Sequence, residues 1–240
     1  MRKRRKQELI AGRKIELLLP EKYDNRMTYP VVWLLDGDTI FQILDQIPEE
    51  QKIYNFIIAG IPASDRVSEY TPWPAKALNK RFPDFGGTGA EHLGYLISQI
   101  MPPMCEKYHC VSTPCGNAIM GYSLGGLLSA YSLFVTEVFG RILSMSGSFW
   151  YDGWTQYITQ APLINHSAHV YISSGENEGG HAHDIKRNAA PATEQTFQFL
   201  KNSLPDSRVY LEWNPYGHHD HMILKIQRAL SYLNHEFSQN

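Results

Sequence analysis

A serine flanked by glycines is the feature of this sequence that most clearly suggests chemistry. Residues 121–125 read Gly-Tyr-Ser-Leu-Gly, a G-x-S-x-G pattern between a short apolar run and a helical pattern. In a strand–turn–helix setting the glycines allow a sharp, close turn, and the hydroxyl of Ser123 is exposed on it. Leu124 would begin the helix with its amide directed at a developing oxyanion. The pattern therefore predicts a nucleophilic serine that accepts an acyl group.

A serine hydroxyl needs a general base, and the base needs a carboxylate that orients it. In folds with this turn the chain order is serine, then acid, then histidine. Both partners follow late apolar runs in that order: Glu176 and Glu178 come after 170–173, and a stretch rich in histidine, 217–221, comes after 209–213. The residues alone leave both glutamates open as the acid, and His218, His219 and His221 open as the base.

The elements that must position these residues alternate along the chain. Apolar, β-rich runs predict strands, and 3.6-residue periodicity predicts helices. The strands are expected at 15–19, 30–35, 53–59, 117–121, 141–145, 169–173 and 208–213, and the helices at 90–107, 124–134, 192–203 and 222–237. This alternation predicts an α/β fold, a mostly parallel central sheet with helices on both faces. Ligands bind such sheets at the carboxyl ends of the strands, where the serine, acid and histidine turns fall.

Composition sets the limits of the molecule. The chain has 240 residues, of which 43% are hydrophobic, and we expect one domain over 13–240 after a basic, frayed N-terminus over 1–12. A net charge of -2 argues against binding nucleic acid. No apolar run reaches a membrane span, and the basic start lacks the apolar segment of a signal peptide, so a cytoplasmic location is expected. The three cysteines form neither a disulfide framework nor a zinc pair.

Five segments in order resemble the putative-esterase family of α/β-hydrolases, which includes esterase D, the enterochelin esterases and the mycolyltransferases. Residues 29–37 resemble the family's strand ending in Leu-Asp-Gly, and 68–73 resemble its Glu-Tyr-Thr-Pro segment. The serine turn follows, then Ser-Gly-Ser-Phe-Trp at 146–150 and Gly-Glu-Asn-Glu at 175–178. The resemblance covers nearly the whole chain and implies the α/β-hydrolase fold.

The resemblance also implies roles for particular residues. Ser123 would be the nucleophile and Glu178 the acid, with Glu176 as the fallback. His219 would be the base, because residues 217–230 then match the family's histidine block and following helix without a gap; His218 stands where the family has glycine, and His221 is the second choice. The backbone N–H groups of Asp38 and Leu124 would form the oxyanion hole.

The function implied is a serine esterase that hydrolyses a carboxylic ester through an acyl-enzyme on Ser123. Arg66, Tyr70, Tyr122 and Trp150 are candidates for substrate binding. We expect a small-molecule ester as the partner, with no cofactor, no metal, no nucleic acid and no membrane span; the oligomeric state is open. The ester could be a siderophore trilactone, a small carboxylic ester or a sugar ester.

Other functions remain open on the same sequence. A thioesterase similar to S-formylglutathione hydrolase, or an acyltransferase, would use the same serine. A non-catalytic binding module would keep the fold without the chemistry. A metal centre would need the imidazoles of His181 and His183 to join those of the 217–221 stretch, without any H-E-x-x-H signature.

Overall fold

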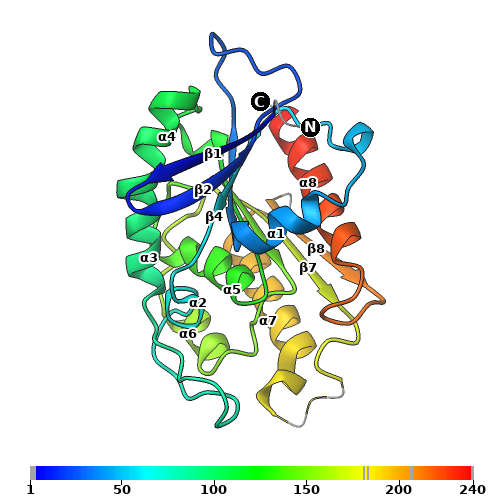
Figure 1. The fold of residues 1–240 in the computed structure, drawn as a ribbon. Helices are drawn as coiled ribbons and strands as arrows, with labels where there is room; N and C mark the ends of the chain where they lie inside the picture. The colour runs from blue at the N-terminus through cyan, green and yellow to red at the C-terminus, as the bar shows by residue number, and fades with distance from the viewer. Residues whose placement is uncertain (1–3, 181, 183, 206–207, 239–240) are drawn as a thin grey trace.

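An eight-stranded sheet forms the centre of the molecule (Figure 1). The computed structural model describes residues 4–180, 182, 184–205 and 208–238. The strands are β1 Arg5–Ile10, β2 Arg13–Leu18, β3 Val31–Leu35, β4 Ile57–Ile61, β5 Asn117–Tyr122, β6 Arg141–Met145, β7 His169–Gly175 and β8 Val209–Asn214. Their order is β1-β2-β4-β3-β5-β6-β7-β8; β2 pairs antiparallel with both neighbours, and every later pair is parallel. The predicted α/β fold with a mostly parallel sheet is confirmed.

Helices cover both faces of this sheet. They are α1 Gly37–Leu44, α2 Arg66–Glu69, α3 Gly89–Tyr95, α4 Met101–Tyr108, α5 Leu124–Tyr131, α6 Trp154–Gln160, α7 Ala189–Ser203 and α8 Met222–Ser238. Single turns of 3₁₀-helix lie at 49–51, 114–116, 132–134 and 185–188. Figure 1 shows α1 and α8 together on one side of the strands. Among the described residues no helix is both long and apolar enough to cross a membrane.

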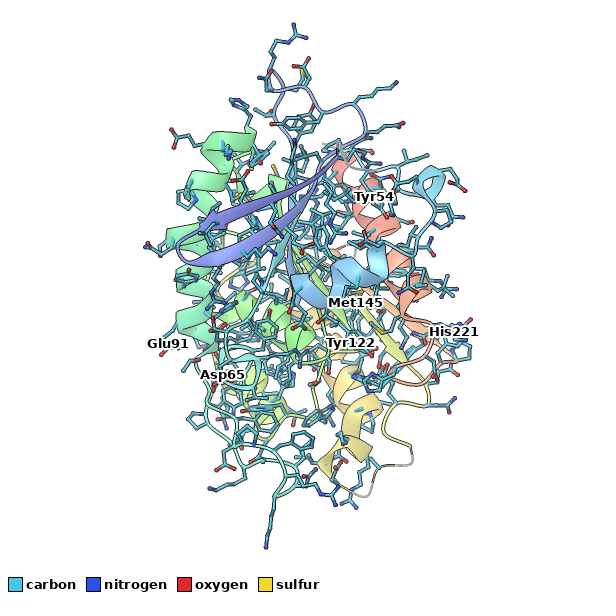
Figure 2. The ribbon with its side chains drawn as sticks, in the orientation of Figure 1. Tyr54, Asp65, Glu91, Tyr122, Met145 and His221 are labelled. Carbon is cyan, nitrogen blue, oxygen red and sulfur yellow. The ribbon has the colours of Figure 1, made fainter. Side chains whose placement is uncertain are left out.

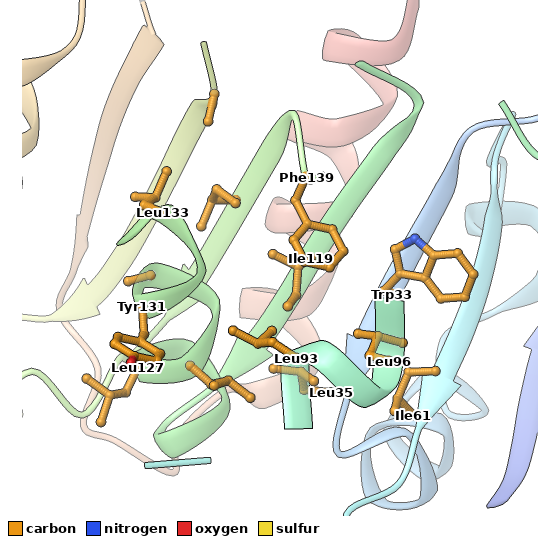
Figure 3. Close-up of a cluster of buried hydrophobic side chains, with 14 of the residues drawn as sticks. Trp33, Leu35, Ile61, Leu93, Leu96, Ile119, Leu127, Tyr131, Leu133 and Phe139 are labelled. Carbon is orange, nitrogen blue, oxygen red and sulfur yellow. The ribbon is translucent and has the colours of Figure 1, made fainter. Parts of the chain in front are cut away.

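The core has two parts, one on each face of the sheet. On one face, side chains of β3, β4 and β5 pack against α3, α4 and α5, as the cluster around Trp33, Ile119 and Leu127 shows (Figure 3). On the other face, alternate residues of the same strands pack against α1 and α8. β3 is buried along its whole length because both of its faces are covered, which explains its uninterrupted apolar sequence. The Trp33 indole N–H donates to Asn117 Oδ1 at 2.9 Å, so its polar atom is satisfied inside the core.

The helix predicted over 90–107 is divided into three segments. A π-helical turn at Leu96–Ile100 separates α3 from α4. Pro102 and Pro103 follow directly, and neither carries an amide hydrogen with which to bond the carbonyl four residues earlier. The regular hydrogen-bond ladder is therefore interrupted, and the backbone widens into a π turn at this point.

The N-terminal segment is ordered where we expected fraying. β1 pairs with β2 along its whole length, and the turn between them places both Ala11 and Gly12 at positive φ, 49° and 80°, as a two-residue hairpin requires. Arg5 forms ion pairs with Glu16 and Asp45. The expectation for 1–12 is wrong over residues 5–10, because the basic side chains find acidic partners on the sheet and on the α1–β4 connection instead of remaining solvated.

Candidate active site

Three turns at the carboxyl ends of parallel strands bring a serine, a glutamate and a histidine into one hydrogen-bonded chain. Ser123 follows β5, Glu178 follows β7, and His218 lies between β8 and α8. His218 Nε2 lies 3.1 Å from Ser123 Oγ, and His218 Nδ1 lies 2.7 Å from Glu178 Oε2. With the Nδ1 proton donated to the carboxylate, Nε2 is left to accept the serine proton. This is the geometry of a nucleophile, a base and an orienting acid.

Ser123 sits on the strained turn that its glycine neighbours predict. Its φ and ψ are 59° and -118°, a region that a residue with a side chain seldom occupies. A Cβ atom at Gly121 would lie 2.2 Å from the carbonyl oxygen of Gly125, so only glycine allows the strand and helix to approach this closely. The Ser123 amide donates to the carbonyl of Met145 at 3.0 Å, which fixes the turn against β6.

Glu178 is buried and held by several donors. Its Oε1 atom accepts from the Ser146 hydroxyl at 2.6 Å and from the Gly175 amide at 2.9 Å. Burial alone would raise the pKa of Glu178, but the hydrogen bonds from His218, Ser146 and Gly175 outweigh it and hold that pKa below its ordinary value. The carboxylate is therefore ionised and oriented at neutral pH. Glu176 is exposed, and its amide donates to the carbonyl of Asn214.

The structure places His218, and not the expected His219, in contact with both serine and glutamate. His219 meets the His218 ring edge-on at 4.7 Å and has no hydrogen bond to Ser123 or Glu178 among the described atoms. Burial, together with the nearby His218 and Lys225, lowers the pKa of His219. His221, the second choice, has a φ of 52° and packs on Tyr216 at 4.1 Å (labelled in Figure 2). The gapless match to the family pattern thus points to the residue that follows the histidine in contact with Ser123 and Glu178.

Two side chains behind the loop explain which imidazole turns inward. Tyr122 lies at the end of β5 and is labelled in Figure 2. Its hydroxyl donates to the His218 carbonyl. Lys225 Nζ donates to the carbonyls of Gly217 and His218 at 2.7 and 3.0 Å. With its carbonyl held from behind, His218 directs its ring toward Ser123. Sequence reasoning missed Lys225; its signal was a lysine on the apolar stripe of α8, one turn before Ala229.

The two expected oxyanion donors lie at the starts of helices. Leu124 is the first residue of α5, so its amide has no partner within the helix. Asp38 is the second residue of α1, and the helix begins directly after Asp36, whose φ is 55°. Arg66 binds Asp36 through two hydrogen bonds of 2.7 and 2.8 Å and also donates to the Tyr122 carbonyl at 3.3 Å. That arginine joins the α1 turn to the serine turn, and the donor role of Asp38 stays a prediction.

Of the four substrate-binding candidates, only Trp150 lines the cleft. Tyr70 is fully buried, and its hydroxyl accepts from the Asp36 amide at 2.8 Å. Tyr122 is also buried and turned toward the His218 carbonyl, while Arg66 is occupied by Asp36. These three side chains therefore contact the turns of the site, and none of them belongs to the lining of the cleft. Charged and aromatic residues near a cleft look alike in sequence whether they bind a ligand or support the turn beneath it.

A cleft of about 500 Å³ opens over Ser123 and His218. Its walls come mainly from the turns after β7 and β8 and from the segment before α7. The lining residues are Ser123, Trp150, Asn177, Glu178, Gly179, Ala182, Lys186, Ala189, Gly217, His218 and His219. Residues 62–89 form a long connection that carries Trp73, Phe82 and Phe85, and none of them belongs to this lining. Trp73, in that segment, instead donates its indole N–H to the Asp152 carbonyl and packs on Tyr151.

The described residues contain no group of three or more His, Cys, Asp or Glu side chains arranged to hold a metal ion. His181 and His183, which the metal alternative requires, lie outside the described residues.

Backbone strain gathers at the turns of this site. Six non-glycine residues in the described ranges have positive φ, and four of them, Asp36, Ser123, Ser146 and His221, follow strands β3, β5, β6 and β8. Ser146 also supplies a hydrogen bond to Glu178. Strained backbone in folded proteins persists where the surrounding structure over-determines it, commonly at functional sites.

Known proteins resemble this chain in sequence and in fold. YbbA of Bacillus subtilis (strain 168), an uncharacterised protein, is 32% identical over 232 residues, which cover 93% of each chain. The ferri-bacillibactin esterase BesA of the same organism is 22% identical, and the match covers 86% of this chain and 79% of BesA. The crystal structure of an IroE-like serine hydrolase from Shewanella oneidensis superposes with a TM-score of 0.79 at 18% identity, covering 96% of this chain and 80% of that one. The model of the putative esterase family matches residues 7–222, and the chain belongs to that family.

Proposed function

We propose that this protein is a serine esterase that hydrolyses a carboxylic ester through an acyl-enzyme on Ser123, with His218 as the base and Glu178 as the acid. One observation carries the proposal: the hydrogen-bonded chain from Ser123 through His218 to Glu178 opens on a cleft large enough for a small ester. Membership of an esterase family supports it. His218 takes the role that we had expected of His219.

The reaction has two halves. Ser123 Oγ attacks the acyl carbonyl while His218 Nε2 accepts the hydroxyl proton, and a tetrahedral oxyanion forms. That intermediate collapses, the bond to the alcohol breaks, and the alcohol leaves with the proton from His218. A water molecule then attacks the acyl-enzyme and gives a proton to His218. When the second intermediate collapses, the carboxylic acid departs and Ser123 recovers its proton.

The surrounding backbone supplies the charge stabilisation in this proposal. The amide of Leu124, at the N-terminus of α5, is one oxyanion donor, and the amide of Asp38 is the other. Loss of one such donor typically raises the barrier by about 2.7–4 kcal/mol. Glu178 stabilises the imidazolium that forms twice in the cycle, because its carboxylate is buried and 2.7 Å from Nδ1.

A siderophore ester is the substrate class that the relatives suggest. BesA is a ferri-bacillibactin esterase, and one of the similar solved structures is of the enterobactin hydrolase IroE. The cleft itself carries Lys186 and His219 on its wall, and both can donate hydrogen bonds to an oxygen-rich ligand. Trp150 offers an aromatic surface beside them.

The test is an ester panel with purified protein. It should contain p-nitrophenyl esters of increasing acyl length, a thioester and a catecholate trilactone. The wild-type protein should hydrolyse at least one oxygen ester and bind a fluorophosphonate probe covalently, whereas Ser123→Ala should do neither. Equal hydrolysis by Ser123→Ala would refute the nucleophile assignment, and a thioester preferred over every oxygen ester would reassign the substrate class.

A further inference from the structure

A buried lysine lies directly behind the proposed histidine–glutamate pair. The side chain of Lys225 is only 3% exposed. It sits one turn into α8, and helical side chains point back toward the N-terminus, so its ammonium reaches the loop that precedes the helix. There it donates to the carbonyls of Gly217 and His218. It also lies 3.6 Å from Glu178 Oε1 and 3.5 Å from the hydroxyl of Ser146.

This placement is costly for a lysine. Removing an ammonium from water is unfavourable unless hydrogen bonds and an opposite charge replace the solvent. Burial lowers the pKa of Lys225, and Glu178 opposes that effect. The ammonium is satisfied by groups of the site and not by a surface partner. An apolar residue here would follow the buried pattern of Ile226 and Ala229 without that cost.

Other charges face the same region from the neighbouring elements. Glu178 approaches from the turn after β7, while Asp220 and His219 belong to the loop that Lys225 holds. Tyr122 approaches from β5 and shares the His218 carbonyl with Lys225, although its buried hydroxyl is neutral because burial raises its pKa. Within the part of the chain that the structure describes, Lys225 and a protonated His218 are the cations that lie within 4.0 Å of the Glu178 carboxylate.

We propose that Lys225 is a positioning residue of the esterase: its ammonium holds the loop that carries His218 and offsets the charge of Glu178, so His218 remains a proton acceptor to lower pH. This inference rests on the proposed function. The loop part follows from the two hydrogen bonds to the carbonyls of Gly217 and His218. The charge part follows because a positive neighbour disfavours a second positive charge, here the imidazolium.

The Lys225 ammonium and a protonated His218 carry the same charge beside one carboxylate. In wild type, Lys225 partly neutralises Glu178 and repels a protonated His218. Without that ammonium, Glu178 acts on the imidazolium alone, and the imidazolium becomes more stable. His218 then stays protonated up to a higher pH and cannot accept the serine proton there. The acidic limb of the pH profile, the pH range over which kcat/KM falls as the solution becomes more acidic, should therefore shift to higher pH.

The experiment compares Lys225→Met with Lys52→Met. Lys52 is a matched control because its side chain is also 3% exposed and paired with a glutamate, Glu49, but it does not line the cleft. For Lys225→Met we expect kcat to fall about 10- to 100-fold, the scale of lost hydrogen bonds to a charged group, with little change in KM. The acidic limb should rise by roughly one pH unit. Lys52→Met should leave both kcat and the limb at the wild-type values.

Thermal unfolding of every variant separates these effects from misfolding. Lys225→Arg keeps the charge, so its acidic limb should stay near wild type even where kcat falls. If Lys225→Met does not fold, Lys225→Gln takes its place, because it also removes the charge but keeps a donor for the carbonyls of Gly217 and His218, and its acidic limb should rise in the same way. A folded Lys225→Met with an unmoved acidic limb overturns the inference while the proposed function stands. If the wild-type protein itself neither hydrolyses esters nor reacts with a fluorophosphonate, the proposed function fails first.

Discussion

Exchanging the adjacent histidines one at a time tests the assignment of the base. His218→Asn removes the imidazole that lies 3.1 Å from Ser123 Oγ and 2.7 Å from Glu178 Oε2. Asparagine is preferred over alanine because its amide can still donate to the buried carboxylate. His219→Asn removes a ring that touches His218 edge-on at 4.7 Å and lines the cleft. The two changes are chemically identical and one residue apart.

The expected magnitudes differ by several orders. In serine triads, removal of the histidine alone costs about as much as removal of the whole triad, on the order of 10⁶-fold in kcat. We therefore expect kcat of His218→Asn to fall about 10⁴- to 10⁶-fold, which corresponds to a barrier higher by about 5–8 kcal/mol. The His219 ring transfers no proton in the proposed reaction, so we expect His219→Asn to change kcat/KM by no more than about 10-fold, mainly through KM.

The assay is the initial rate with a p-nitrophenyl ester, measured beside the rate of fluorophosphonate labelling. Both readouts need an activated Ser123, and labelling is insensitive to traces of contaminating esterase. Unfolding curves confirm that each variant is folded. If His219→Asn loses more than about 100-fold while His218→Asn keeps a tenth or more of the wild-type rate, the geometry described here does not carry the reaction.

Three further predictions concern side chains around the site and the core. Tyr122→Phe removes one of two donors to the His218 carbonyl, so kcat should fall about 3- to 10-fold at unchanged KM in the same ester assay. Arg66→Ala leaves Asp36 without its ion pair; because 38% of the Arg66 side chain is exposed, the loss is about 1–2 kcal/mol, seen as a fall in Tm of about 2–8 °C, and KM should stay within about threefold. Burial lowers the pKa of His92 in the folded protein to about 4, against the opposing effect of the neighbouring Glu69 carboxylate. As the pH falls below 6.5, His92 therefore becomes protonated in the unfolded chain before it does so in the folded protein, and the folded state loses stability. Urea unfolding should therefore show about 2 kcal/mol less stability at pH 5 than at pH 7 from this group, and His92→Gln should reduce that difference.

The elements could be predicted from the sequence because their patterns are local. The apolar run of β3 and the glycines around Ser123 reflect constraints set within a few residues. The order of serine, acid and histidine then followed from the order of the strands. The choice among adjacent histidines of one loop has no such local signal. Whether His218 or His219 turns inward depends on donors from β5 and α8 that are distant in sequence.

The supporting residues were harder to predict than the reacting ones. Tyr70 and Arg66 stand in a motif with the composition of a binding site, yet both serve the backbone and carboxylate of Asp36. The N-terminal segment was expected to be frayed for a similar reason. Its basic sequence suggests a solvated chain, because the acidic partners of Arg5, Glu16 and Asp45, cannot be recognised in the sequence. Such roles depend on long-range pairing, and no local pattern encodes it.

The positive φ angles that follow β3, β5, β6 and β8 have a consequence for engineering the protein's stability. Each such residue costs on the order of 1–3 kcal/mol relative to relaxed backbone, and glycine would recover part of it. At Ser123 that exchange would also delete the proposed nucleophile, and at Ser146 it would delete a hydroxyl that donates to Glu178. Screening for thermal stability alone would thus favour changes that erase activity, a trade-off seen in other enzymes. A more durable version should be sought in the hairpin of β1 and β2 or in the helix interrupted at Leu96–Ile100, where relaxing the backbone removes no group of the site.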